Sequence, residues 1–430
     1  MKSPHEWRIY TLGAILWAAL TMCSRYFGDR GGPQFMASLT LAGIAYLLAI
    51  REFFATPHFS RRIVVIGLGL AAVWHIEFLR LPTGTDDDIH RYVWDGRLQR
   101  LGNNPYLVIP SDPVVKELHT TQTRNLNNPD LPSPYPPGAQ LFFRAVTALQ
   151  ESTFALKVAF VVCDFVIVFV LFDLLRHNQQ GSHLVLAFAW NPLLAVEVAG
   201  SGHIDIVGAL FLVVSAAALA RRWRTIAALA FGLAVAVKFL PIVLLPLYWK
   251  RIRIRDAALA TAMIALLYVP FLSHGRIPTG SLGTYVQTFR FNAPVFAVFD
   301  HVAPSQLLAG LTVLVGLITA TWLRRVAPEG PGYSFAWPMA ASLFFGPVVF
   351  PWYLLWLLPF LTSGATLLII LWTISIIPTY VQWHLRALGR PWGPLPGWVM
   401  LVEYGCLAAA GAIFAWKRIR SAEALNAQTN

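Results

Sequence analysis

Three adjacent carboxylates, Asp86, Asp87 and Asp88, open the first long polar stretch of an otherwise apolar chain. Acidic residues in the first turn of a helix commonly do no more than stabilise the helix dipole. Three in a row exceed that need, and their mutual repulsion favours the protonated form of one of them, which suits a general base. The residue types alone leave both interpretations open.

A short amphipathic helix is expected to carry these carboxylates. Thr85 precedes Asp88 by three residues, which is the spacing of a capping box at the start of a helix. Apolar residues then recur at helical spacing, namely Ile89, Val93, Trp94, Leu98 and Leu101. Arg91, Tyr92 and Asp95 share one face with Asp88. We therefore predict a helix at the membrane surface with acidic and basic groups on its polar face.

The composition indicates a membrane protein. Of the 430 residues, 57% are hydrophobic and 13% are charged, whereas soluble domains carry about 25% charged residues. The net charge of +12 comes with arginine and lysine clusters at the ends of apolar segments, as in 221–224 and 250–255. This is the positive-inside pattern, and it argues against a nucleic-acid partner. The three cysteines, Cys23, Cys163 and Cys406, lie in apolar runs without paired spacing, which predicts neither disulfides nor a metal site.

Apolar segments of about the length that a bilayer requires recur along the whole chain. They lie near residues 9–24, 36–54, 62–79, 154–176, 184–199, 204–220, 256–273, 304–323, 335–362, 364–382 and 396–416. With the positive clusters inside, both termini are cytoplasmic and the aspartates face outward. The expected fold class is all-α: a polytopic bundle of about 11–13 transmembrane helices that forms a single domain, residues 1–430, in a bacterial inner (cytoplasmic) membrane.

Three segments interrupt this run of spans. Residues 80–153 form a first external loop in which we expect two short amphipathic surface helices, the second after Pro137. Burying its three aspartates in the bilayer would cost about 8–10 kcal/mol, so they lie at the aqueous face. Residues 225–249 carry Lys238 and are interpreted as a re-entrant pair of half-helices, with a kinked span as the alternative. Residues 274–303 form a second external loop.

Several polar motifs follow one another over roughly residues 80–360. They are Asp87-Asp88-Ile89-His90-Arg91-Tyr92-Val93-Trp94-Asp95-Gly96-Arg97, Gly102-Asn103-Asn104-Pro105-Tyr106, Tyr135-Pro136-Pro137, Asn191-Pro192-Leu193 with Glu197, Gly202-His203-Ile204-Asp205, Gly232-Leu233-Ala234-Val235-Ala236-Val237-Lys238 and Pro351-Trp352-Tyr353-Leu354-Leu355-Trp356. In this order they resemble GT-C-type glycosyltransferases, and more narrowly the bacterial polyprenyl-phosphate-mannose-dependent mannosyltransferases. Two departures stand out: His90 replaces an expected aromatic residue, and Asp86 adds a third acid to the usual pair.

The resemblance implies a membrane enzyme that moves a hexose, by analogy mannose, from a polyprenyl-phosphate donor to a hydroxyl of a lipid or glycan at the periplasmic face. Transfer would invert the anomeric carbon, with Asp87 or Asp88 as general base and Asp86 as a further candidate. The expected ligands of the donor phosphate are Lys238, Arg290 and Arg91, and the expected substrate contacts are Asp95, Tyr135, His203, Asp205, Trp352 and Tyr353. The resemblance implies no nucleotide sugar, no cofactor and no resident metal.

Two other functions compete with this one. A flippase or transporter of lipid-linked sugars would need polar residues through both leaflets, whereas the polar groups here gather on the outer side. An O-antigen-type ligase with a pyrophosphate-linked donor would need more external arginine and histidine than residues 274–303 supply. His203 and Asp205 could be a metal pair, but they lack a clear third ligand.

Overall fold

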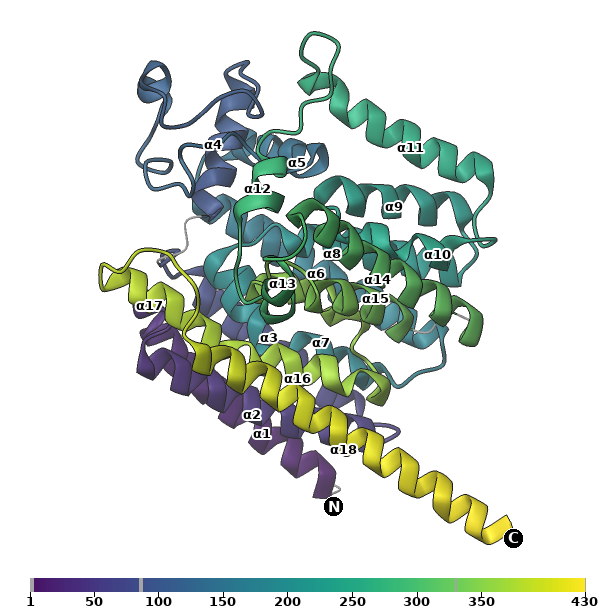
Figure 1. Ribbon diagram of the computed structural model, residues 1–430. Coiled ribbons are helices and arrows are strands. Elements are labelled where there is room, and N and C mark those ends of the chain that lie inside the picture. Colours follow the sequence, from purple (N-terminus) through teal and green to yellow (C-terminus); the bar gives the residue numbers. More distant parts are fainter. Residues whose placement is uncertain (1–3, 85–87, 329, 331, 430) are drawn as a thin grey trace.

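Helices make up the architecture of the described chain. The computed structural model describes residues 4–84, 88–328, 330 and 332–429, and these contain no strand. Both termini lie at the same end of the molecule, while the long C-terminal helix extends beyond the remaining helices (Figure 1). The predicted all-α fold class is confirmed.

The chain begins with three long helices, α1 (Pro4–Arg25), α2 (Pro33–Ala55) and α3 (Arg61–Leu79). Helix α1 packs against both α2 and α3. The remaining α-helices are α4 (Asp88–Arg100), α5 (Pro137–Leu149), α6 (Thr153–His177), α7 (Val185–Ala189), α8 (Asp205–Ala220), α9 (Arg224–Val237), α10 (Leu245–Tyr248), α11 (Ile254–Tyr268), α12 (Leu282–Thr288), α13 (Pro294–Phe299), α14 (Ser305–Val326), α15 (Tyr333–Phe344), α16 (Leu367–Ser375), α17 (Val381–Ala387) and α18 (Gly397–Thr429).

Shorter helical turns separate many of these helices. A π-helix covers Leu194–Ser201. Single 3-10 segments lie at Phe27–Asp29, Pro113–Leu118, Ser182–Leu184, Leu240–Leu244, Val269–Phe271, Pro351–Trp356, Leu358–Phe360, Gly364–Thr366 and Ile377–Tyr380. Proline is frequent in them because it removes a backbone N–H donor and cannot continue an α-helix.

The protein is a multi-pass membrane protein. Seven described helices are long and apolar enough to cross a bilayer, or up to eight if Ser182–Ala189 and Leu194–Ser201, bent by 59°, count as one span. Asp205–Ala220 and Arg224–Val237 are apolar but shorter. The number of uninterrupted helices is lower than the 11–13 predicted spans because several predicted spans are divided into short pieces.

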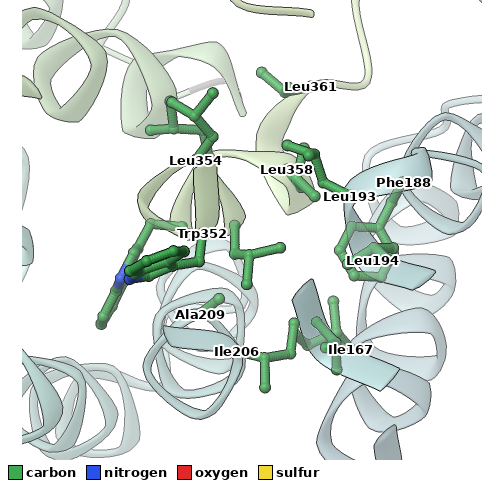
Figure 2. Close-up of a cluster of buried hydrophobic side chains, with 14 of the residues drawn as sticks. Ile167, Phe188, Leu193, Leu194, Ile206, Ala209, Trp352, Leu354, Leu358 and Leu361 are labelled. Atoms are coloured by element: carbon green, nitrogen blue, oxygen red, sulfur yellow. The ribbon is translucent and has the colours of Figure 1, made fainter. Parts of the chain in front are cut away.

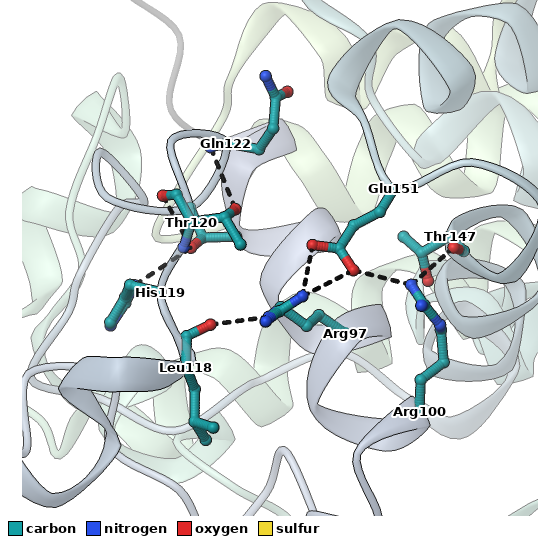
Figure 3. Close-up of polar contacts among 9 residues, drawn as sticks. Arg97, Arg100, Leu118, His119, Thr120, Gln122, Thr147 and Glu151 are labelled. Carbon is teal, nitrogen blue, oxygen red and sulfur yellow. Dashed lines mark hydrogen bonds and ion pairs between the residues drawn. The ribbon is translucent and has the colours of Figure 1, made fainter.

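Residues 80–153 contain the two predicted short helices, α4 and α5, which pack against each other. Arg97 and Arg100 of α4 both bind Glu151, at 2.8 to 3.0 Å, just before α6 (Figure 3). Arg97 also donates to the carbonyl of Leu118 at 2.8 Å, so the covering loop is attached to α4 (Figure 3). Helix α4 differs from the predicted surface helix because most of its residues are buried beneath this loop and α5.

A cluster of apolar side chains fixes the segment that follows α15. Figure 2 shows Ile206 and Ala209 of α8 beside Ile167 of α6 and the leucines of residues 354–361. All of them are buried in the main core. Because interiors are close-packed, the 3-10 turn Pro351–Trp356 has a fixed position between these helices.

The close approach of Gly31 to Tyr380 gives a test of this packing. Gly31 has φ +85°, and a Cβ there would lie 1.8 Å from the carbonyl oxygen of Tyr380. We expect Gly31→Ala to lower the free energy of unfolding by at least about 1–3 kcal/mol, since an L-residue is strained at this φ. Gly28→Ala is the control, because a Cβ at Gly28 meets nothing within 4 Å. Thermal unfolding of the purified protein in detergent compares them, and equal midpoints would contradict the described contact.

Candidate active site

One cavity of about 420 Å³ collects side chains from distant parts of the chain. Its walls include Asp88, Arg91, Tyr135, Lys238, Trp352 and Tyr353, all of which were expected to act on donor or substrate. A carboxylate and two cations therefore face one hollow. Such a hollow suits an anionic ligand with a group that must lose a proton.

Asp88 is the first residue of α4, and its side chain is 16% exposed. The amide of Asn127 donates to its Oδ1, and Nδ1 of His203 lies 3.7 Å from its Oδ2. Asp86 and Asp87, the other predicted bases, lie outside the described residues, as does Thr85 of the predicted capping box. Asp88 is thus the candidate base that the structure describes at the cavity.

Arg91 is almost completely buried, at 2% exposure, although it lines the cavity. Its Nη2 donates to the carbonyls of Asn128 and Leu131, each at 2.8 Å. Its Nε and Nη1 have no hydrogen-bond partner among the described residues. A buried guanidinium with unused donors is suited to bind an anion.

Lys238 lies at the end of α9, where the backbone becomes extended at φ −160° and ψ 146°. Its Nζ lies 2.8 Å from Oδ1 of Asp205 and 3.8 Å from the ring centroid of Tyr353. Asp205 also accepts a hydrogen bond of 2.7 Å from Nε1 of Trp356. The break in residues 225–249 therefore falls next to Lys238, and the re-entrant course of this segment stays a prediction.

Asp95 was predicted to contact substrate, but it lies behind the residues that line the cavity. Its Oδ2 accepts hydrogen bonds from Ser133 at 2.5 Å and Gln140 at 2.9 Å, and the residue is fully buried. Burial raises the pKa of Asp95 to about 6, against the opposing effects of Arg91 and the two hydrogen bonds. Asp95 does not line the cavity and attaches α4 to α5 and the covering loop.

His203 and Asp205 lie behind the cavity wall and are both fully buried. The ring of His203 stacks on Trp352, with centroids 4.0 Å apart and an interplanar angle of 9°. Asp205 reaches the cavity only through Lys238. These two residues support the lining side chains from behind.

Arg290 is not brought to the cavity. Its guanidinium binds both carboxylate oxygens of Asp300, at 2.8 and 2.9 Å, and the hydroxyl of Ser305 at 2.7 Å. The bond from Arg290 holds the pKa of Asp300 below its usual range. Arg290 thus stabilises the segment 274–303, and we do not retain it as a phosphate ligand.

Sequence reasoning missed part of the lining. Tyr285 lines the cavity and shares a hydrogen bond of 2.5 Å between its hydroxyl and that of Tyr353. Trp383, Arg386 and Trp392 contribute a further wall from α17 and the following loop. The sequence signal that could have identified this wall was the run of aromatic residues and arginines between the predicted spans 364–382 and 396–416.

The raised pKa of Asp95 gives a prediction for stability. The native protein binds this proton more tightly than the unfolded chain, so the stability contribution of Asp95 falls as pH rises from 3.8 to about 6. A shift of this size corresponds to about 3 kcal/mol. Asp95→Asn should remove the fall, because the amide oxygen can accept both hydrogen bonds. Unfolding midpoints in detergent from about pH 4 to about pH 8 measure it, and parallel curves for the two proteins would contradict the burial effect.

Comparisons with known proteins identify the family. The family model "Alpha-(1->6)-mannopyranosyltransferase, N-terminal domain" matches residues 20–251, which is more than half of the chain. The chain is similar to the solved structure titled "Crystal Structure of ArnT from Cupriavidus metallidurans bound to Undecaprenyl phosphate", at 15% identity and a TM-score of 0.47. That similarity covers 83% of this chain but 64% of the other, so this chain spans less than two thirds of that structure. No curated protein matches. The family match includes Asp88, Arg91 and Lys238, and by this match the chain belongs to the alpha-(1->6)-mannopyranosyltransferase family.

Proposed function

We propose that this protein is a membrane glycosyltransferase that moves a mannosyl group from a polyprenyl-phosphate donor to a hydroxyl of a lipid or glycan acceptor at the periplasmic face. The observation that carries the proposal is the shared cavity, which Asp88 lines together with the cations Arg91 and Lys238. The family assignment supports mannose as the sugar. A donor with an apolar tail suits a site that is built among membrane helices.

Asp88 is the general base of the proposed reaction. Its carboxylate accepts the proton of the acceptor hydroxyl while the hydroxyl oxygen forms a bond to the anomeric carbon. The bond from that carbon to the phosphate oxygen breaks, and the polyprenyl phosphate leaves with the electron pair. Attack and departure on opposite faces of the sugar invert its configuration. Asp87 and Asp86 remain candidates for the same role.

Arg91 and Lys238 offset the charge that develops on the leaving phosphate. The guanidinium of Arg91 keeps two buried donors, Nε and Nη1, beyond the bonds that Nη2 makes to the covering loop, and its positive charge acts on a phosphate in the cavity that it lines. Lys238 adds a point charge that Asp205 and Tyr353 already hold in place. Because these donors are fixed before the donor lipid arrives, little reorganisation is needed during the reaction.

Aromatic side chains supply the remaining walls. Tyr135 and Tyr353 offer aromatic surface on which the apolar face of a sugar ring can pack, and Trp352, whose ring already stacks on His203 and Phe350, offers its edge. We assign them to sugar binding, and we assign His203, Asp205 and Asp95 to holding this wall and α4 in place.

The base assignment is tested by Asp88→Asn. We expect transfer of radiolabelled mannose from polyprenyl-phosphate-mannose in membrane vesicles to fall by about 10²–10⁴ because the acceptor proton has no base. Asp130→Asn, on an exposed residue of the same loop, should retain full activity. Full transfer by the Asp88 variant would reject Asp88 as the base. Movement of the labelled lipid across the bilayer without transfer would instead support a flippase.

The phosphate assignment is tested by Lys238→Gln and Arg91→Gln. Each should lower kcat by about 10²–10³, since a donor to the developing charge is lost. Arg144→Gln is the matched control, because Arg144 is exposed on α5 and does not line the cavity. The same vesicle assay measures all three. An unchanged kcat in both cavity variants would place the phosphate elsewhere.

A further inference from the structure

A buried cluster of charged groups lies behind the cavity wall. Glu197 and His203 are fully buried, and Arg30 is 1% exposed. Nε2 of His203 lies 3.0 Å from Oε2 of Glu197, and Nη2 of Arg30 lies 3.7 Å from the same oxygen. The hydroxyl of Tyr380 donates to Oε1 of Glu197. Burying so many charges away from water is costly unless they are paired, so their arrangement needs an explanation.

The backbone fixes the distance between Glu197 and His203. The π-helix ends at Ser201, and the amides of Gly202 and His203 both donate to the carbonyl of Glu197, at 3.1 and 3.0 Å. Gly202 allows this turn because its φ is +82°. π-Helical turns are frequent at functional sites, since they displace one side chain from the regular helical position.

The second ring nitrogen of His203 faces the cavity wall. Its Nδ1 lies 3.7 Å from Oδ2 of Asp88, so the imidazole stands between two carboxylates. Trp352 stacks on the ring, and an indole is a favourable neighbour for a cation. With His203 protonated, the two cations Arg30 and His203 balance the two carboxylates Glu197 and Asp88.

We propose that His203 is a positioning residue that acts as an imidazolium, held in that form by Glu197, and keeps the carboxylate of Asp88 ionised and ready to accept a proton. The proposal rests on the proposed function of Asp88 as base. Removal of the imidazolium leaves Asp88 in the protonated form up to a higher pH, where it cannot act. In this role His203 transfers no proton, because the proton of the acceptor hydroxyl still goes to Asp88.

Other titratable groups face Asp88 and remain in place when His203 is changed. They are Arg91, Tyr92, Tyr135, Tyr285, Arg386 and the pair formed by Asp205 and Lys238. Burial raises the pKa of Tyr92 and Tyr135 well above the usual range, so both stay neutral during an assay. Asp205 and Lys238 form an ion pair of 2.8 Å. A change in the pH dependence on replacing His203 therefore reports the lost imidazolium.

The experiment is the pH profile of kcat/KM for His203→Gln in vesicles with polyprenyl-phosphate-mannose. We expect the acidic limb to move to higher pH by roughly one to three units, as on loss of an opposite charge at this distance. Activity below the limb should drop at least about tenfold and should recover at alkaline pH. Glu197→Gln should shift the limb in the same direction, which gives a second measurement if the first variant is not inserted.

His75→Gln is the matched control. His75 pairs with Asp164 at 2.8 Å, both are at most 2% exposed, and neither lines the cavity. This variant should lose stability without any shift of the profile. A uniform loss of activity at every pH in the His203 and Glu197 variants would overturn the positioning role while leaving Asp88 as base. Full activity of Asp88→Asn would instead reject the proposed function, so the two failures are distinguishable.

Discussion

Pairing of buried charges is the constraint on which this structure depends. Three charged groups at the cavity are held by neighbouring groups of the protein: Lys238 by Asp205, Asp88 by Asn127 and His203, and Arg91 by two backbone carbonyls. An ionised side chain among membrane helices is expensive unless such partners compensate for lost hydration. Asp88, Arg91 and Lys238 all line the cavity. The same contacts that permit burial thus also orient the charges toward the cavity.

Breaks in regular helices provide the places where these partners meet. Helix α9 ends one residue before Lys238, a π-helix precedes His203, and a 3-10 turn carries Trp352. Irregular backbone is tolerated at membrane depth only where protein or an internal cavity surrounds it. The apolar packing in Figure 2 surrounds two of these breaks. The long unbroken helices α2 and α6 contribute no lining residue, and α6 packs against the π-helix and α8 from behind.

Local sequence patterns predicted the features that depend on residues close together in the chain, namely the long apolar helices. Hydropathy located α2, α3 and α14 to within a few residues, because about twenty apolar residues are needed to cross a bilayer. Polar residues within apolar surroundings drew attention to Asp88 and Lys238, and both line the cavity. The family resemblance was confirmed by the match over residues 20–251.

Long-range contacts explain what the sequence did not reveal. Arg290 resembled a phosphate ligand, but its partner Asp300 arrives only after the chain turns back through α13. The surface position expected of α4 depended on where residues 103–135 fold, and they cover it. Trp383 and Arg386 reach the cavity from the far end of the chain, a placement that no local pattern contains. Likewise, the sequence did not reveal that Glu197 belongs to a buried charged cluster, because that follows only from its contacts with Arg30 and Tyr380.

A structure of the protein with polyprenyl phosphate bound, solved in a lipid nanodisc, tests the central claim most directly. The account predicts the phosphate within hydrogen-bond distance of both Arg91 and Lys238, with Asp88 across the cavity from it. A phosphate bound away from these two cations, for example beside Arg290 in the second external loop, would contradict the account.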